Sequence, residues 1–225
     1  MSAKFIVDDK NGPIRIRLLR RIFYLFSNVL FFTYYYICQR SSRMVWIPSP
    51  KGLQKRFSST QRPMIYYAWH GDSWWLIAAV MMLPPELRPV GICNSGTMSR
   101  LNSRASAWLG VDMFEYSLKS ERSARRQITD FVKTSGRHIM VFPDAGGPYR
   151  QLRPGILSIA LEAEADLLPV GLKVRPKIVI GRIMQHRVPF PFSRVEVFWA
   201  QPFSGRDATT RNANRALQEL GVTRH

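Results

Sequence analysis

The residues best suited to chemistry lie in two stretches, each directly after a short apolar run. His70 follows the run Met64–Ala68, and Asp144 follows the run His138–Phe142. A neutral imidazole, with an ordinary pKa of about 6.5, is a suitable general base near neutral pH, which makes His70 the candidate base. From position alone, the plainer interpretation is a histidine that hydrogen-bonds within its loop.

Asp72 stands two residues after His70 and admits two interpretations. Its carboxylate could bind the second ring nitrogen of His70, which would fix the tautomer and the basicity of the imidazole. It could instead cap the helix expected at 72–82. Asp144 is the other candidate for orienting the ring, and the sequence leaves these possibilities open.

The stretch 143–154 has the composition of an anion-binding loop. Gly146 and Gly147 allow close approach of the backbone to a ligand, and Arg150 and Arg153 supply cations for a phosphate beside Asp144. A surface turn with solvated arginines is the alternative. The loop matches neither a Walker A motif nor GxGxxG, so a nucleotide site is not supported.

Two further loops could bind an anion through hydroxyls and backbone N–H groups. They are Asn94–Gly96 and Ser117–Ser120, and the second contains Lys119. Helix capping by serine is the commoner explanation of such loops.

No pattern in the sequence indicates a metal or a redox cofactor. Cys38 and Cys93 lie far apart and form no CxxC motif, while His138 and His186 are interpreted as structural or surface residues. We therefore expect no cofactor, and a body that works in a reducing cytoplasm.

Apolar runs alternate with helical patterns along most of the chain. Strands are expected at 64–68, 88–93, 111–115, 138–142, 167–172, 178–183 and 195–200, and helices at 72–82, 97–109, 120–134, 155–163 and 207–220. This alternation predicts an α/β fold with a largely parallel or mixed sheet flanked by helices. Loops at the carboxyl ends of parallel strands share one rim of a sheet, so the His70 and Asp144 loops should meet.

The N-terminal part predicts contact with a membrane. Residues 22–38 carry no charge and have basic residues on both sides. The run ends in Tyr34-Tyr35-Tyr36 rather than in small residues, which argues against a signal peptide, and it is at the short limit for a spanning helix. We expect a helix lying in the membrane interface, with a spanning helix or a buried helix as alternatives. The expected organisation is a membrane-associating segment at 1–40, a connector at 41–61 and an α/β domain at 62–225.

The composition fits one folded domain with anionic partners. The chain has 225 residues, 46% of them hydrophobic, which excludes a disordered chain. Its 33 Lys and Arg against 15 Asp and Glu give a formal net charge of +18, which favours an anionic bilayer, acidic substrates or nucleic acid. Since no nucleic-acid-binding motif accompanies the charge, nucleic acid is the weaker alternative.

Four short motifs in order resemble those of a known family. They are Trp69-His70-Gly71, Phe142-Pro143-Asp144-Ala145-Gly146-Gly147-Pro148, Leu152-Arg153-Pro154-Gly155 and Leu168-Pro169-Val170. Together, over roughly residues 60–205, the chain resembles the lysophospholipid acyltransferase-like superfamily. The most similar branch is a bacterial one of unknown function with Trp-His-Gly and Pro-Asp-Gly-Pro-type motifs.

The resemblance implies a membrane-associated O-acyltransferase at the cytoplasmic face of the cell membrane. It implies a fatty acyl group carried by acyl carrier protein or coenzyme A and accepted by a hydroxyl of an anionic lipid or lysophospholipid. His70 would be the general base, and the loop 143–147 with nearby cations would hold the phosphate or polar head of the acceptor. Both donors are anionic, which suits the basic chain.

The chain departs from the family pattern at the site itself. Glycerolipid acyltransferases carry His-x-x-x-x-Asp, whereas Trp75 stands at the position of the acid here. Related loops often have Glu in place of Asp144, and Gly in place of Ala145 in the similar branch. These differences keep a second hypothesis open, a non-catalytic lipid-binding or membrane-scaffold protein of the same fold. A third, nucleic-acid binding, depends on the charge alone.

Overall fold

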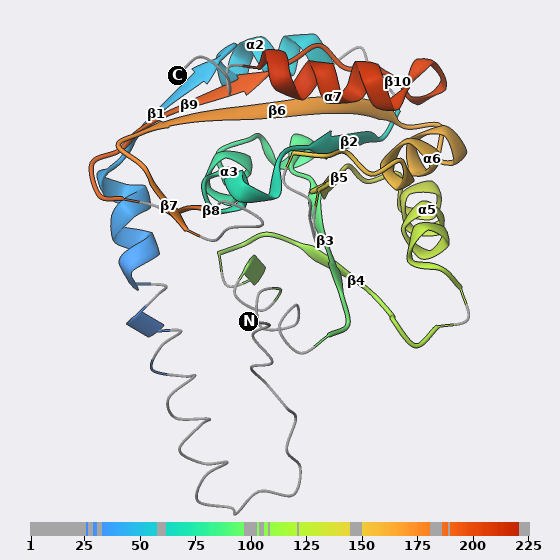
Figure 1. Ribbon diagram of the computed structural model, residues 1–225, viewed down its shortest axis with the longest axis horizontal. Helices are drawn as coiled ribbons and strands as arrows, with labels where there is room; N and C mark the ends of the chain where they lie inside the picture. Colours follow the sequence, from blue (N-terminus) through green and yellow to red (C-terminus); the bar gives the residue numbers. More distant parts are fainter. Residues whose placement is uncertain are drawn as a thin grey trace, which may run out of the picture.

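The computed structural model describes residues 26, 29–30, 33–57, 62–96, 103, 106–107, 109–120, 122–144, 150–180, 186–188 and 190–220. In this part of the chain, eight strands form one sheet and two more form a separate hairpin (Figure 1). The strands of the sheet are β1 (Arg43–Ile47), β2 (Met64–Tyr67), β3 (Val90–Asn94), β4 (Met113–Tyr116), β5 (Ile139–Val141), β6 (Asp166–Arg175), β9 (Arg194–Trp199) and β10 (Phe203–Ser204). The hairpin consists of β7 (Ile178–Ile180) and β8 (His186–Val188).

The sheet is mixed and largely parallel. Its order is β1-β9-β6-β2-β5-β3-β4, and β10 pairs separately with β6. The pairs of β6 with β9 and with β10 are antiparallel, and the other pairs are parallel. The prediction of a largely parallel or mixed sheet flanked by helices is therefore confirmed.

Helices cover both faces of the sheet, as parallel strands require. The α-helices with complete bounds are α2 (Pro50–Phe57), α3 (Ser73–Met81), α5 (Ala124–Ser135), α6 (Gly155–Glu162) and α7 (Thr210–Glu219), and the 3₁₀ turns are η1 (His70–Asp72), η2 (Pro85–Leu87) and η3 (Gly205–Asp207). In Figure 1, α3 lies below β6 and α7 above it. The helix expected at 97–109 falls largely outside the described residues, of which 103 and 106–107 are helical.

Successive residues of β2 supply the two halves of the core. Tyr66 packs with α2 and α3, and its hydroxyl donates to the carbonyl of Leu87 at 2.9 Å. Tyr67 packs with α5, α6 and α7, and its hydroxyl donates to the carbonyl of Ala213 at 3.1 Å. Because β2 is buried on both faces, its position is well fixed, and so is the start of the His70 loop that follows it.

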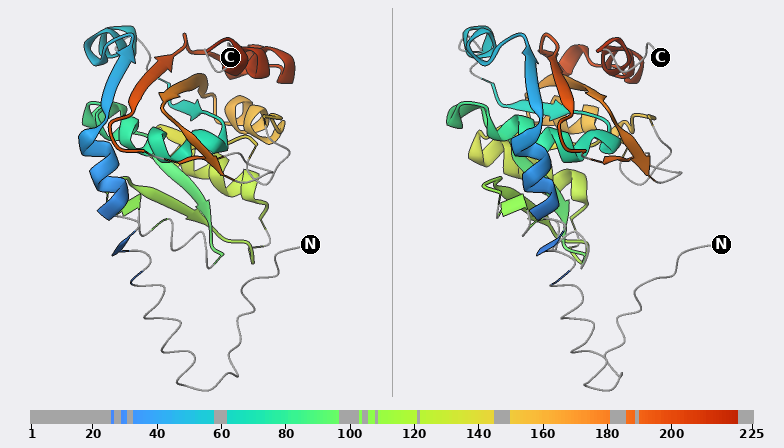
Figure 2. Two further views of the ribbon diagram at one scale, coloured as in Figure 1. Left: turned by 60° about the vertical axis from the view of Figure 1, so that its left-hand side comes forward. Right: turned by 90° about the vertical axis from the view of Figure 1, so that its left-hand side faces the viewer.

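Part of the expected connector, 41–61, belongs to the sheet. Strand β1 pairs in parallel with β9 (Figure 2), and Trp46 stacks on Trp199 with ring centroids 5.5 Å apart. Leu53 of α2 is fully buried in the same core as α3. These residues therefore complete one edge of the sheet.

The end of the N-terminal apolar run forms a helix that packs on the body. Residues 33–41 are helical, Tyr35 and Cys38 are buried, and the Tyr35 hydroxyl donates to the carbonyl of Trp74. The boundary expected at residue 40 thus falls inside a packed helix. Within the described residues, none of the helices has both the length and the apolar character needed to cross a bilayer.

Candidate active site at the His70 loop

The two stretches singled out in the sequence meet at one rim of the sheet. Strands β2 and β5 are neighbours and parallel, with Tyr67 opposite Val141 near their carboxyl ends. His70 then opens the turn η1, and Asp144 lies in the turn after β5. Gly146 and Gly147, expected in the same site, lie outside the described residues.

The Asp144 carboxylate joins the two loops through their backbones. It is 1% exposed; Oδ1 accepts from the backbone N–H of His70 at 2.8 Å, and Oδ2 accepts from that of Arg150 at 3.2 Å. The backbone of Arg150 has a φ of 56°, which lies in the left-handed region that residues other than glycine adopt only uncommonly. The expected role of Asp144 in binding a polar head does not fit this geometry, because both oxygens are engaged internally and their charge would repel a phosphate.

The His70 imidazole lies between two other rings. Its centroid is 5.3 Å from that of Phe142 and 4.9 Å from that of His186, both in edge contact. Burial and the neighbouring His186 lower the pKa of His70, while the Asp144 carboxylate opposes them. The ring is therefore neutral at neutral pH, the form in which it can accept a proton.

Asp72 takes neither of the roles expected for it. Its carboxylate is buried and lies 2.8 Å from Nη1 of Arg187. Neither oxygen forms a hydrogen bond to any described residue, and the side chain does not cap α3 although Asp72 stands at the N-cap. Burial raises the pKa of Asp72, and the Arg187 guanidinium opposes this most strongly.

The residue five positions after His70, Trp75, lies in the core. Trp75, a residue of α3, is fully buried in the same core cluster as Tyr66 and Met140. Nδ1 of His70 is itself buried and has no hydrogen-bond partner in the described part of the chain. Across those residues, no carboxylate orients the imidazole through the ring.

Cations gather around the carboxylates of the site. Arg187, Arg150 and Lys177 all lower the pKa of Asp72, which places their charges near it. Burial, then Arg187 and Arg150, lower the pKa of Lys177, as expected where several cations lie together. This arrangement could hold an anionic group beside His70.

The other expected binding residues lie at different distances from His70. Arg153 is exposed next to the Asp144 turn, and its backbone N–H donates to the carbonyl of Pro143 at 3.1 Å. Lys119 is exposed after the edge strand β4, three strands from β2. At about 4.8 Å per strand, this is roughly 14 Å across the sheet, so the structure does not bring Lys119 to the His70 loop.

Three residues of the site were not found from the sequence. His186 and Arg187 belong to the short hairpin strand β8, and Lys177 lies in the turn between β6 and β7. His186 was expected to be a structural or surface residue. No local pattern marks it, because only the folding of the hairpin against η1 brings it to His70.

Of the comparisons with known proteins, the one with solved structures bears on the fold. No protein-family model matches the sequence, and no curated protein shows significant sequence similarity to it. Among solved structures, the chain is similar to the crystal structure of the 1-acyl-sn-glycerophosphate (LPA) acyltransferase PlsC from Thermotoga maritima. The TM-score is 0.51 at 15% identity, over 92% of this chain and 90% of that one. At this identity, the likeness shows a shared fold.

Proposed function

We propose that this protein transfers a fatty acyl group from a thioester donor to a hydroxyl of an anionic lipid, with His70 as the general base. The observation that carries the proposal is the place of His70 at the rim of the sheet, where its ring lies between Phe142 and His186 and its backbone N–H donates to Asp144. The fold shared with an LPA acyltransferase supports the choice of acyl transfer among reactions that need such a base.

In this reaction, His70 takes the proton of the acceptor hydroxyl as the oxygen attacks the thioester carbonyl. A tetrahedral intermediate forms, the carbon–sulfur bond breaks, and the leaving thiolate receives the proton from the His70 imidazolium. The negative Asp144 carboxylate, bonded to the His70 backbone, stabilises this transient positive charge. No carboxylate on the ring is needed for these steps, although one would make the base stronger.

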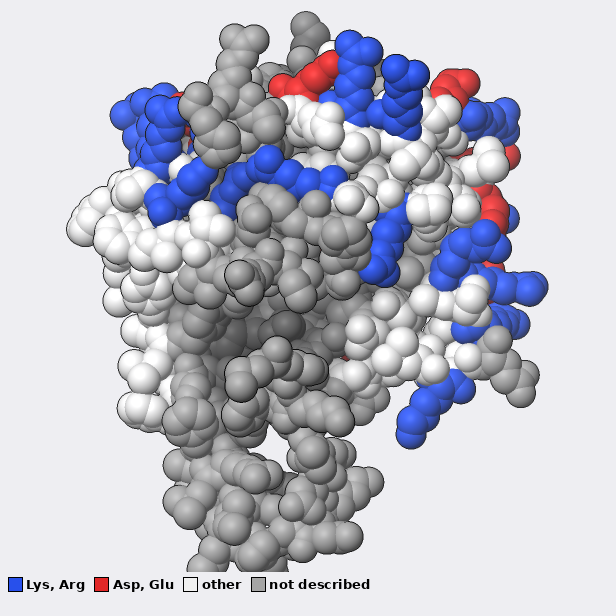
Figure 3. All heavy atoms as spheres, viewed as in Figure 1, with Lys and Arg blue, Asp and Glu red and all other residues white. Residues whose placement is uncertain are grey.

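The cations near the site suit an acceptor with a phosphate or another anionic head. We assign this role to Arg150, Lys177 and Arg153 in place of Asp144, which serves to hold the two loops together. Acyl carrier protein and acyl-coenzyme A are both anionic and suit the net charge of +18 as donors. On the face seen in Figure 3, Lys and Arg side chains outnumber acidic ones along the upper part.

The exposed apolar side chains suit attachment to the cytoplasmic face of an anionic membrane. In the helix 33–41 and at the described helical residues before it, the exposed apolar side chains are Phe26, Val29, Leu30, Tyr34, Tyr36 and Ile37. The turn with Phe190 and the 82%-exposed Phe192 adjoins this helix, because the Phe192 N–H donates to Oγ of Ser41 at 3.1 Å. Arg40 and Arg43 are exposed beside them, so apolar groups and cations form one surface, as interfacial segments do.

The test is acyl transfer from labelled acyl carrier protein and acyl-coenzyme A to a panel of lysophospholipids and other hydroxyl lipids. We expect transfer to an anionic acceptor, and a loss of roughly 10²- to 10⁴-fold in His70→Ala, the scale of general-base catalysis. The variant should keep the melting temperature and the vesicle binding of the wild type. An equally active His70→Ala variant would refute the assignment.

One observation favours a second candidate, a lipid-binding protein without catalysis. Trp75 fills the place of the acid that orients the imidazole in active relatives, and it is fully buried. Saturable binding of anionic lipids without acyl transfer from either donor would establish this candidate. Steeply salt-dependent binding of nucleic acid, with no preference for anionic vesicles, would instead favour the interpretation based on charge.

A further inference from the structure

A buried ion pair fixes the β7–β8 hairpin against the His70 turn. Arg187 of β8 is 5% exposed; its Nη1 lies 2.8 Å from Asp72 of η1 and donates to the carbonyl of Leu172 in β6 at 2.8 Å. One guanidinium therefore links the turn, the hairpin and the central sheet. The residue before it, His186, lies against the ring of His70.

We propose that His186 is a positioning residue for acyl transfer by His70, because it packs against a ring that no carboxylate of the described residues orients. This role builds on the proposed function of His70. His186 supports one flank of the catalytic ring and keeps that ring unprotonated, and the Asp72–Arg187 pair holds His186 in place.

The geometry supplies both effects. The two ring centroids are 4.9 Å apart at an interplanar angle of 63°, while Phe142 closes another flank at 5.3 Å and 83°. The ring of His70 is thus held by packing, without a hydrogen bond to any described residue at Nδ1. Two imidazolium ions so close together would repel each other strongly, so protonation of one opposes protonation of the other.

The other charges around the pair act in both directions. Asp144 raises the pKa of both His70 and His186, whereas burial lowers both. Asp72 is compensated by Arg187, and Arg150 and Lys177 add positive charge around it. Burial is the largest cause of the lowered pKa of His70, and His186 is the neighbouring charged group that lowers it further.

The decisive variant is His186→Phe, which keeps an aromatic ring against His70 and removes the titrating nitrogens. We expect the pKa of His70, followed by NMR of the ring protons, to rise in this variant. Acyl transfer should then fall about threefold to tenfold near pH 5.5 and stay unchanged near pH 8, because only the acidic limb moves. His138, at the other end of β5, where Nδ1 accepts from the Met64 N–H, is the internal control and should titrate as before.

An unchanged titration of His70 in His186→Phe would overturn the proposal, as would an equal loss of activity at every pH. The NMR titration needs no turnover, so it separates this proposal from the proposed function. If the titrations of His70 and His186 were coupled but the protein transferred no acyl group, the proposal for His186 and His70 as a pair would stand and the acyltransferase function would be refuted. If His186→Phe does not fold, His186→Gln removes the same charge with a smaller, polar side chain, and the same outcomes apply.

Discussion

At the scale of single residues, the acidic groups of the site act on the protein rather than on a ligand. Both oxygens of Asp144 accept hydrogen bonds from backbone N–H groups, and Asp72 forms an ion pair with the buried guanidinium of Arg187. The sequence analysis named both residues but did not predict these partners. A motif shows which side chains are present, whereas the direction of a carboxylate depends on which donors the fold brings within reach.

Asp144→Asn tests the linking role of this carboxylate. An amide keeps one acceptor and turns an NH₂ group toward the other backbone N–H, so one buried donor loses its partner. We expect a loss of about 1–3 kcal/mol in the free energy of unfolding, measured by denaturant titration, together with reduced acyl transfer.

Asp130→Asn is the matched control for this substitution. Asp130 makes an exposed ion pair with Arg122 at 3.1 Å on α5, and such pairs contribute about 0–1 kcal/mol. If Asp144→Asn proved as stable as Asp130→Asn, the carboxylate would not be the link between the two loops.

At the scale of elements, the strands that could be predicted are those with strong local patterns. The runs at β2, β5 and β6 are apolar and bounded by turn residues, and the structure places strands there. The hairpin strand β8 lacks such a signal, since only one of its three residues, Val188, is apolar. Strand β1 was not predicted, although Met44–Ile47 are apolar. Both strands form because of partners far along the chain, namely β9 for β1 and the turn η1 for β8.

The Asp72–Arg187 pair should therefore be the main attachment of β8 to the site. Arg187→Met leaves the Asp72 carboxylate buried without its cation, and we expect a cost of about 3–5 kcal/mol in unfolding free energy. In the double variant Asp72→Asn/Arg187→Met neither charge of the pair remains, so part of the loss should be recovered. Denaturant titration of the three proteins measures the difference; a double variant less stable than Arg187→Met would contradict this account of the pair.

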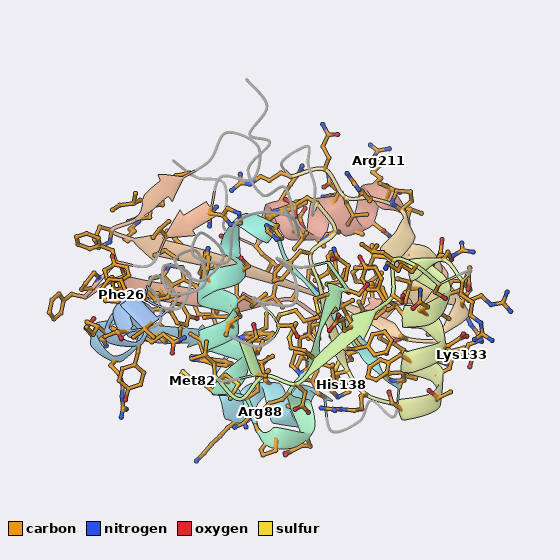
Figure 4. The ribbon with its side chains drawn as sticks, turned by 90° about the horizontal axis from the view of Figure 1, so that it is seen from below. Phe26, Met82, Arg88, Lys133, His138 and Arg211 are labelled. Atoms are coloured by element: carbon orange, nitrogen blue, oxygen red, sulfur yellow. The ribbon has the colours of Figure 1, made fainter. Side chains whose placement is uncertain are left out.

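At the scale of the whole molecule, the helix 33–41 connects exposed apolar groups with the candidate site, because its Tyr35 hydroxyl donates to the carbonyl of Trp74 at the start of α3, just after the His70 turn. Figure 4 shows Phe26 on the opposite side of the molecule from Lys133 of α5. The helix 33–41 buries Tyr35 and Cys38 in the core. Removal of residues 1–40 would therefore unfold part of the body, and substitutions of exposed side chains are the better test of membrane attachment.

Ile37→Ser and Phe192→Ser should weaken binding to anionic vesicles. Burial of a large apolar side chain contributes about 1.5–3 kcal/mol, so each substitution should lower vesicle affinity by roughly tenfold or more. Leu161→Ser is the matched control, since Leu161 is 54% exposed on α6, at the far end of the sheet in Figure 1. Co-sedimentation with vesicles measures the effect, and equal losses in all three variants would exclude a localised attachment surface.

The pairing of β1 with β9 also bears on the order in which the chain folds during synthesis. Strand β1 leaves the ribosome early, but its partner is among the last strands to be made. Until then, β1 and the apolar helix before it have no completed sheet edge to pack on. Contacts between distant parts of a chain form slowly, and apolar segments exposed in the meantime are prone to aggregate. The nascent chain would gain from reaching a lipid surface before its last strand is made.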